Sequence, residues 1–573
     1  MSKEEKIIED EDAKTNKNLL PKEDPLEAML AHVGEMGRYQ KYLLLGMCPF
    51  GVLFSIVYFV QMFITLTPQA HWCRVPELSH LAPEVRRNLT SPKLDDEYDK
   101  CSMFVANWSH VLETMTPPHP STPTTACLYG WDFEFTDIPY PTVVSDRGWV
   151  CEKSGYVPTA QTMFFAGSFV GVIFFGWMAD TYGRVPALVA STTMAFFGGI
   201  ATIFTSGFWD FMICRFITGL SYDSIIMLIY ILVLEYIGPR YRTLVANTTM
   251  AIYYGGGCLL LPWLALWLAD WRKLLWVTSG PLVMIAIVPF TVPESARWLL
   301  TRGRVDGAVK MLRKFERINR RTIPQDELEE FIVKWSHAKQ SNESIKSLFK
   351  SALLRKMLVF QVVLYMMVSL VYDALVRMSE NLGVDVFLTF TLASATEIPA
   401  IAIVVVVLDR WGRRNVTSAS LAVAGIVSVF AVFLSKGVPL VATAVFARFL
   451  INISFTALMQ WTAELLPTSV RASGSSFIHV SIYLSTMLSP FVVYSAHVWL
   501  GLPFVILALL LVMAAGFSVM LPETMGRPLP QTFEEGETLI REYSLCGKTE
   551  DADVELQYRK RSLIIKEDIG TLK

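Results

Sequence analysis

The chain of 573 residues is 53% hydrophobic and only 18% charged, with a mean hydropathy of +0.40, which excludes an ordinary soluble globular protein. A formal net charge of −2 and the lack of a basic stripe give no reason to expect nucleic-acid binding. We therefore expect a protein embedded in a membrane.

Apolar runs long enough to cross a bilayer as helices recur along the chain. About 20 apolar residues are needed to span a hydrocarbon core of roughly 30 Å. The sequence predicts twelve such helices, near residues 42–66, 155–178, 186–206, 211–234, 244–268, 274–292, 356–376, 386–408, 416–435, 439–462, 475–498 and 501–521. This pattern predicts an all-α polytopic membrane protein.

The remaining segments divide the chain into halves, a loop, a linker and two tails. We expect six-helix halves at 42–292 and 356–521, with a large extracellular loop at 67–154 inside the first. A linker at 293–355 joins them, and its basic and acidic blocks are typical of short amphipathic helices. The charged tails, 1–41 and 522–573, flank the halves.

Arginines after helices 2, 4, 8 and 10 predict the orientation in the membrane. Positive residues favour the cytoplasmic side, which places both termini in the cytoplasm of a multi-pass plasma-membrane protein. Arg272 and Lys273 between helices 5 and 6 are an exception. The arginines concerned are Arg184, Arg240, Arg242, Arg410, Arg413, Arg414 and Arg471.

The loop at 67–154 contains cysteines and glycosylation acceptors. Cys73, Cys101, Cys127 and Cys151 predict two disulfides in an oxidised ectodomain, and the sequence leaves all three pairings open. Asn88, in Asn-Leu-Thr, and Asn107, in Asn-Trp-Ser, predict glycans.

Charged motifs recur at an offset of 229 residues and indicate a duplicated six-helix unit. Parallel halves of this kind are typical of transporters whose halves rock about a site at mid-depth. We expect these acids and arginines to pair across the halves and hold an inner gate closed; the alternative is that the basic residues only set orientation. The matched residues are Asp180, Gly183 and Arg184 with Asp409, Gly412 and Arg413, Glu235 and Arg242 with Glu464 and Arg471, and Glu294 with Glu523.

Several motifs resemble those of a known transporter family. Gly176-Trp-Met-Ala-Asp180-Thr-Tyr-Gly183-Arg184 resembles the signature loop of the major facilitator superfamily. The stretches Pro293-Glu294-Ser295-Ala-Arg297-Trp298, His32-Val-Gly34-Glu-Met-Gly37-Arg38, Trp149-Val-Cys151 and Leu521-Pro522-Glu523-Thr524 are similar to the organic cation, organic anion and carnitine transporters. The resemblance covers about residues 30–535 and implies the major facilitator fold and carriage of an organic solute.

Two acids lie near the midpoints of predicted helices. Charged residues at this depth are costly and usually line a polar cavity, so Asp223 in helix 4 and Glu397 in helix 8 are candidate substrate ligands. Asn452, at Asp223 plus 229, is expected to face the same cavity. The alternative is that each acid is neutralised by a buried partner or by protonation.

The resemblance gives mixed information on the charge of the substrate. Glu397-Ile-Pro399-Ala400 resembles a Glu-x-Pro-Ala stretch in which the family's glutamate contacts substrate. Asp223 stands where some cation carriers have Lys, and Tyr483 stands where the family has Asp or Arg. Two mid-membrane acids without a lysine favour an ammonium substrate.

Further side chains on the same helices could contribute to binding or gating. Tyr365, Tyr372 and Tyr230 are candidates for cation–π contacts, with packing as the alternative. Asp373 and Arg377, four residues apart, are a candidate outer-gate pair or an interfacial salt bridge. His479 also lies in helix 11 and could titrate near neutral pH.

We therefore expect a secondary-active or facilitative transporter of small organic cations or zwitterions in the lipid bilayer. The alternatives are an organic anion exchanger of the same fold and a non-transporting membrane receptor or scaffold. We expect no enzymatic activity, cofactor or metal, and no use of ATP, because no phosphate-binding Gly-x-x-x-x-Gly-Lys-Ser/Thr loop occurs in the sequence. A co-transported or exchanged ion stays open.

Overall fold

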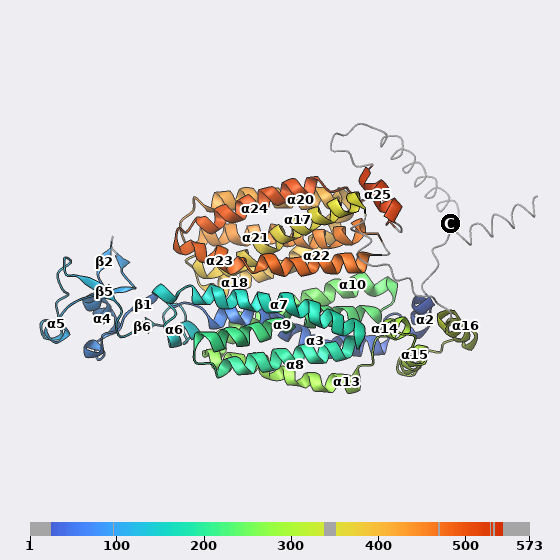
Figure 1. Cartoon of the computed structure of the whole chain (residues 1–573), viewed down its shortest axis with the longest axis horizontal. Coiled ribbons are helices and arrows are strands. Elements are labelled where there is room, and N and C mark those ends of the chain that lie inside the picture. The colour runs from blue at the N-terminus through green and yellow to red at the C-terminus, as the bar shows by residue number, and fades with distance from the viewer. Residues whose placement is uncertain are drawn as a thin grey trace, which may run out of the picture.

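The computed structural model describes residues 25–94, 97–336, 351–467, 470–527, 529–530 and 533–541. Within these residues, twelve helical spans are long and apolar enough to cross a membrane. Each coincides with one of the predicted apolar runs to within a few residues, so the predicted fold class is confirmed. The long helices run alongside one another in one elongated bundle (Figure 1).

The first half contains six spans, several of them built from consecutive helical segments. Figure 1 shows this half as the lower layer of the bundle. Its elements are α3 (Arg38–Ile64), α7 (Tyr156–Thr181), α8 (Arg184–Ile203), α9 (Phe208–Glu235), α10 (Pro239–Met250), the π-helix η3 (Ala251–Gly255), α11 (Gly256–Leu268), α12 (Trp271–Ser279), η4 (Gly280–Ile287) and α13 (Val288–Thr291).

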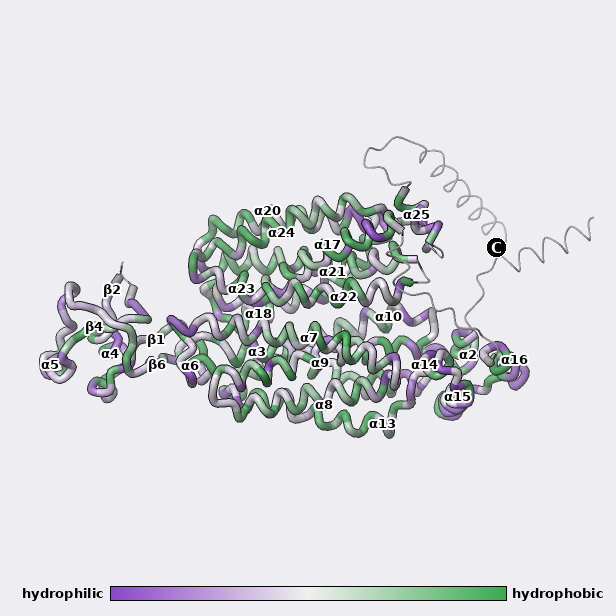
Figure 2. The backbone as a smooth tube through the Cα atoms, in the orientation of Figure 1, coloured by the Kyte–Doolittle hydropathy of each residue, from purple (hydrophilic) through white to green (hydrophobic). Residues whose placement is uncertain are grey.

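The second half forms the upper layer in the same view. Its elements are α17 (Ala352–Arg377), η6 (Met378–Asn381), α18 (Val386–Ala395), α19 (Glu397–Trp411), α20 (Arg413–Ala431), α21 (Val438–Leu465), α22 (Arg471–Thr486), α23 (Ser489–Tyr494), η7 (Ser495–His497) and α24 (Leu502–Val519). Hydrophobic residues predominate along the helices of both layers, whereas hydrophilic residues gather at the two ends of the bundle (Figure 2).

The two ends of the bundle carry different structures. The loop end carries the cysteine-rich segment, which projects away from the helices in Figure 1. The opposite, linker end carries α2 (Pro25–Val33), the linker helices α14 (Ala296–Thr301), α15 (Val305–Asn319) and α16 (Gln325–Ser336), and α25 (Phe533–Arg541). Asn319 accepts a hydrogen bond from the backbone N–H of Tyr39 at 2.8 Å, which fixes α15 to the start of α3.

The cysteine-rich loop is a small structure of short elements. Its described residues form three two-stranded antiparallel sheets, which were not predicted from the sequence. The elements are β1 (Ala70–Cys73), η1 (Pro76–Leu78), α4 (Pro83–Thr90), β2 (Lys93–Leu94), β3 (Glu97–Tyr98), β4 (Ser102–Phe104), α5 (Trp108–Thr114), β5 (Thr124–Ala126), β6 (Trp131–Glu134), α6 (Val143–Arg147) and η2 (Cys151–Lys153), with β1 pairing β6, β2 pairing β3, and β4 pairing β5.

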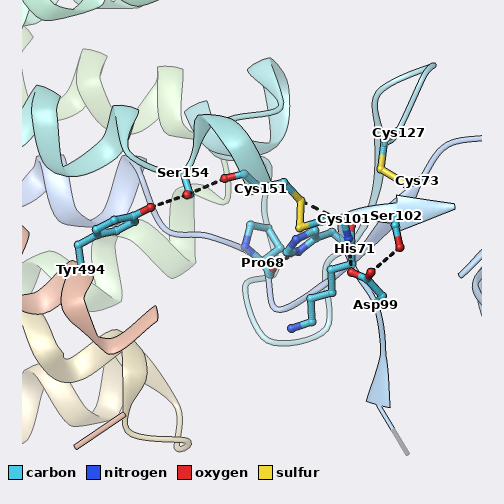
Figure 3. The surroundings of a disulfide bond; sticks show 11 residues. Pro68, His71, Cys73, Asp99, Cys101, Ser102, Cys127, Cys151, Ser154 and Tyr494 are labelled. Atoms are coloured by element: carbon cyan, nitrogen blue, oxygen red, sulfur yellow. Dashed lines mark hydrogen bonds between the residues drawn. A yellow bond between two sulfur atoms is a disulfide. The ribbon is translucent and has the colours of Figure 1, made fainter. Parts of the chain in front are cut away.

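Disulfides hold this loop together. Cys73 bonds to Cys127 and Cys101 to Cys151, which selects one of the three pairings that the sequence leaves open. Figure 3 shows the second bond where the loop meets the bundle, beside the hydrogen bond between Ser154 and Tyr494. Cys151 directly precedes α7, so this bond ties the loop to the start of the second span.

Peptide mapping is expected to recover these two linkages and glycans at Asn88 and Asn107, both of which have exposed side chains. Closing loops of this length stabilises a small domain by about 4 kcal/mol in the chain-entropy model. Replacing Cys101 and Cys151 together by Ser should therefore reduce the amount of protein at the cell surface. Mass spectrometry that found a different pairing, or four free thiols in surface protein, would contradict this assignment.

Candidate functional site

Among the described residues, three buried ion pairs lie inside the helical bundle, and they involve all of the mid-helix acids that the sequence singles out. Asp223 pairs with His479, Glu397 with Arg448, and Asp373 with Arg377. The pairs are contributed by α9, α17, α19, α21 and α22. Because a charge within a membrane is costly without a partner, these contacts define the candidate site.

Asp223 lies near the middle of α9, and its partner comes from the other half of the protein. Its carboxylate oxygen Oδ1 is 3.1 Å from Nε2 of His479 on α22. The Asp223 side chain is 5% exposed and that of His479 is 20% exposed. The buried ring of Tyr483, one turn further along α22, also interacts with Asp223 and meets Tyr222 edge to face at 6.0 Å.

Asn452 makes its hydrogen bond to a residue of its own half rather than to Asp223. It is buried on α21 and its side-chain amide donates a hydrogen bond of 2.9 Å to Thr396 Oγ1, within the second half. The side chain that reaches Asp223 is instead His479, which has no counterpart in the repeat argument. The expectation that Asn452 faces the same cavity as Asp223 stays a prediction.

Glu397 stands where the eighth span is interrupted. The segment α18 ends at Ala395 and α19 begins at Glu397. Pro399 has no backbone N–H to continue the helical ladder, which accounts for a break at this point. The break places the carboxylate beside α17 and α21, where it accepts a hydrogen bond of 2.5 Å from the Tyr372 hydroxyl.

Arg448 neutralises Glu397. Its Nη2 is 2.8 Å from Glu397 Oε1, and its guanidinium lies over the ring of Tyr372 at 3.6 Å from the centroid. Arg448 also donates to the backbone carbonyl of Tyr372. The side chains of Arg448 and Glu397 are 2% and 10% exposed, so the pair is enclosed within the second half.

These contacts correct the electrostatic argument made from the sequence. From the sequence, Asp223 and Glu397 are two mid-membrane acids without a lysine, which favours an ammonium substrate. The structure pairs Glu397 with a permanent cation and Asp223 with a side chain whose charge depends on a proton. The two acids are therefore not equivalent, and only Asp223 has a partner that can lose its charge by releasing a proton.

The candidate tyrosines divide into two groups. Tyr372 contacts Glu397 and Tyr483 interacts with Asp223, so both lie in the cluster formed by the buried ion pairs. Tyr365 packs against Phe455 at 6.2 Å, and Tyr230 lies half-buried two turns from Asp223 towards the linker end.

Three further tyrosines of the cluster are missed by the sequence argument. Tyr58 stacks on Tyr222 at 4.4 Å, and the hydroxyl of Tyr254 lies 3.4 Å from that of Tyr372. They come from α3, α9 and the π-helix η3. Nothing in the spacing of the sequence distinguishes them from packing residues.

Asp373 and Arg377 form the predicted pair at the loop end of α17. Arg377 Nε is 2.6 Å from Asp373 Oδ2, and both side chains are buried. The first half contacts each member, because Tyr58 donates to Asp373 and Arg377 donates to Gln161 Oε1 at 3.2 Å. The pair therefore links the two halves, which a snorkelling interfacial salt bridge would not do.

Other contacts between the halves also lie towards the loop end. Thr162 donates to the Met487 carbonyl at 2.9 Å, and the ring of Phe63 packs against Phe387 and Phe390. Within the described part of the chain, the hydrogen bonds between the halves lie there or at mid-depth. The bundle is thus closed at its loop end.

The charge clusters at the linker end form within each half rather than across the two. In the first half Arg184 is 2.7 Å from Asp180 and 4.0 Å from Glu235. In the second half, Arg413 makes contacts of 3.0 Å with both Asp409 and Glu464. The predicted pairing across the halves is corrected for this conformation, in which the halves meet at the other end.

The repeated glutamates cap repeated helices. Glu294 accepts hydrogen bonds from the backbone N–H groups of Arg184 and Val185 at the start of α8. Glu523 does the same for Arg413 and Arg414 at the start of α20. A carboxylate at a helix N-terminus satisfies free N–H groups and the helix dipole.

The glycines before these helices are required by both conformation and space. Gly183 has φ +121° and Gly412 has φ +85°, values that favour glycine. A Cβ atom at Gly183 would lie 2.2 Å from Glu294 Oε2, and one at Gly412 would lie 2.4 Å from Glu523 Oε2. The motif thus couples a tight turn to a carboxylate cap.

The remaining predicted gate arginines contact other elements of the linker end. Arg242 is 3.0 Å from Glu27 of α2, which also lies 3.4 Å from Arg297. Arg471 donates to the Leu466 carbonyl at 3.2 Å.

Comparison with known proteins decides the family. The family model described as Sugar (and other) transporter matches residues 122–535. The chain belongs to this family. It is 31% identical to the carcinine transporter of Drosophila melanogaster over 89% of this chain and 79% of that protein. It is 30% identical to the beta-alanine transporter of the same species, over 91% and 90%, and 27% identical to solute carrier family 22 member 3 of Mus musculus, over 92% and 98%.

Solved structures agree on the fold. The inward open conformation of the xylose transporter XylE from E. coli covers 87% of this chain and 99% of its own, with a TM-score of 0.56 and 14% identity. The XylE structure bound to 6-bromo-6-deoxy-D-glucose gives a TM-score of 0.55 and 16% identity, over 87% and 99%. The expected major facilitator fold and the resemblance to organic cation transporters are confirmed, and the chain is a transporter.

Proposed function

We propose that this transporter carries small organic cations or zwitterions with an ammonium group across the plasma membrane by alternating access. The loop 67–154 faces outside and both termini face the cytoplasm. Asp223 is the observation that carries the proposal: it is a buried carboxylate at mid-depth whose partner, His479, is not a permanent cation. A neutral imidazole leaves the carboxylate free to bind an ammonium.

The relatives support an ammonium substrate. Two of them are named as transporters of carcinine and of beta-alanine, and both of these solutes carry a primary ammonium group. The aromatic rings beside Asp223 suit the same group, because Tyr483 and Tyr222 offer π surface to a cation at about 0.5–2 kcal/mol per ring. Roles in binding for Glu397, Asn452, Tyr230, Tyr365 and Tyr372 remain predictions.

An organic anion exchanger is the weaker candidate. Such a protein needs a cation that is free to bind the substrate, and the mid-membrane cation Arg448 is already neutralised by Glu397 and lies against Tyr372. Binding an anion there would displace Glu397 into a buried setting without a partner, which costs several kcal/mol.

Alternating access assigns roles to the other charged groups. The Asp373–Arg377 pair closes the external side, where it contacts Tyr58 and Gln161 of the first half. The cytoplasmic clusters around Arg184 and Arg413 keep the helix ends of each half together in this conformation. In the conformation that is open at the loop end, Asp180, Arg413 and the charged residues beside them would instead pair with residues of the other half.

Uptake by cells that express the chain tests the proposal. Labelled beta-alanine, carcinine and tetraethylammonium are compared with succinate, which replaces the ammonium of beta-alanine by a second carboxylate. We expect saturable uptake of at least one ammonium compound and none of succinate. Uptake of succinate alone would support the anion exchanger, and uptake of no solute by surface-expressed protein would support a receptor.

Asp223→Asn separates binding from folding. The amide keeps the shape and can still hydrogen-bond to His479, but it lacks the charge that holds an ammonium. A charge-assisted hydrogen bond contributes roughly 1.5–3 kcal/mol, so the apparent affinity for the ammonium substrate should fall about tenfold to a hundredfold at equal surface expression. The matched control is Asp326→Asn on the exposed surface of α16. An unaltered affinity in Asp223→Asn would show that this carboxylate does not bind the substrate.

A further inference from the structure

One ion pair joins the two moving halves among the described residues, and it is the pair that can lose its charge. Asp223 belongs to the first half and His479 to the second, with 3.1 Å between Oδ1 and Nε2. The other buried pairs, Glu397–Arg448 and Asp373–Arg377, each lie within the second half and involve arginine. Arginine keeps its charge at any accessible pH, whereas histidine titrates near neutrality.

The other ionisable groups of the packed helices have different surroundings. His479 contacts Asp223 of α9, and its helix α22 packs with α7, α17, α21 and α23. Glu397, Arg448, Asp373 and Arg377 are paired as above, and Arg215 donates to Thr202. The remaining titratable or charged side chains of these helices are Asp180, Asp210, Cys214, Tyr222, Tyr230, Glu235, Arg355, Lys356, Tyr365, Tyr372, Glu464, Arg471, Tyr483, Tyr494 and Tyr156. Of all these, the carboxylate in contact with the imidazole is Asp223.

The side chain of His479 is partly exposed while it is paired. Its side chain is 20% exposed against 5% for Asp223, and Ser476, one turn towards the linker end of α22, is exposed. The loop end is closed by Tyr58, Asp373 and Arg377. We therefore expect a proton on the imidazole to exchange with the linker side in this conformation.

We propose that Asp223 holds either the imidazolium of His479 or the ammonium of the substrate, so that the protein exchanges organic cations for protons. This inference rests on the proposed function and adds the coupled ion. When the ammonium binds Asp223, the Nε2 proton of His479 leaves to water on the open side. When the substrate leaves on the other side, His479 takes a proton from that side and pairs with Asp223 again.

The energetics of a buried charge make the exchange obligatory. One positive charge accompanies Asp223 through each conformational change, supplied either by the substrate or by the proton. A protein with neither the substrate nor the proton would carry the unpaired Asp223 carboxylate through the closed bundle, at a cost of several kcal/mol. A monovalent cation and a proton thus cross in opposite directions, and the cycle moves no net charge.

Purified full-length protein in proteoliposomes tests the exchange. Tetraethylammonium is the first probe because it has no proton to lose, and beta-alanine is used if only zwitterions are carried. With an acidic interior we expect uphill accumulation of the label, about tenfold per pH unit at equilibrium for one-to-one exchange. Nigericin, which collapses the pH gradient, should abolish it. A potassium diffusion potential set with valinomycin should leave accumulation of the permanent cation unchanged.

His479→Gln distinguishes proton coupling from a structural contact. The amide can still hydrogen-bond to Asp223 but carries no proton. We expect this variant to retain exchange of labelled for unlabelled solute, because the substrate accompanies Asp223 in both directions. Net accumulation driven by the pH gradient should be lost. His497→Gln makes the same change in η7 and should behave as wild type.

The outcomes separate the two hypotheses. If the wild type shows no exchange of any labelled ammonium solute, the proposed function fails and the proton exchange fails with it. If the wild type exchanges solute but does not respond to the pH gradient, only the inference is overturned. A full response to the gradient in His479→Gln would overturn it as well.

Discussion

Arg448→Ala is expected to remove most of the protein from the cell surface. The change leaves Glu397 enclosed in the second half without its cation, with the Tyr372 hydroxyl as its remaining described hydrogen-bond donor. Removing one partner of a buried ion pair costs about 3–5 kcal/mol, a large part of the stability of a typical domain. Surface biotinylation and thermal unfolding of the detergent-purified protein measure the loss.

A double variant shows whether the loss comes from the unpaired charge. Arg448→Gln combined with Glu397→Gln removes both charges and leaves two amides that can hydrogen-bond to each other, so surface expression should recover relative to either single change. Arg317→Ala on the exposed side of α15 controls for the loss of an arginine. Normal expression and stability of Arg448→Ala would show that Glu397 finds another partner or is protonated.

The positions of the membrane helices could be predicted from the sequence because they depend on local composition. A bilayer sets the length of each apolar run, and α3 and α24 each begin and end within a few residues of the predicted limits. The repeat at an offset of 229 residues was likewise visible, since Gly183 and Gly412 keep the same turn beside the same glutamate cap in both halves.

The partners of the charged residues could not be predicted in the same way. Periodicity places Asp223 and Glu397 at mid-depth, but it does not set the rotation of each helix or the neighbours of each face. Nothing in the sequence pairs Arg448 with Glu397 or His479 with Asp223. Both became partners of the acids because α21 packs with α19 and α22 meets α9 across the halves.

The linker-end clusters show the same limit. Asp180, Arg184 and Glu235 carry enough charge to predict pairing, but the sequence does not say whether the partner is in the same half or the other. The contacts formed depend on the conformation, and this structure is closed at the loop end. The gating role of these residues therefore remains a prediction about the change between conformations.

Tyr58→Phe is expected to shift the protein towards the conformation that is open at the loop end. Its hydroxyl donates to Asp373 across the halves, whereas the ring stacks on Tyr222 within the first half. The substitution removes the hydrogen bond and keeps the ring. Asp373 retains Arg377 at 2.6 Å, so no buried charge loses its counter-ion and folding should be preserved.

A hydrogen bond to a charged group contributes roughly 1.5–3 kcal/mol, so the ratio of open to closed forms should rise about tenfold to a hundredfold. Spin labels at Ser206→Cys and Ser435→Cys report the change, because these exposed positions are related by the repeat and lie on different halves at the loop end. Double electron–electron resonance should show a short distance in the otherwise unaltered protein and a larger fraction of long distances in Tyr58→Phe. Tyr140→Phe is the matched control, since its hydroxyl donates to the Phe63 carbonyl at 3.1 Å within the first half. Identical distance distributions for Tyr58→Phe and Tyr140→Phe would show that the Tyr58–Asp373 bond does not hold the loop end closed.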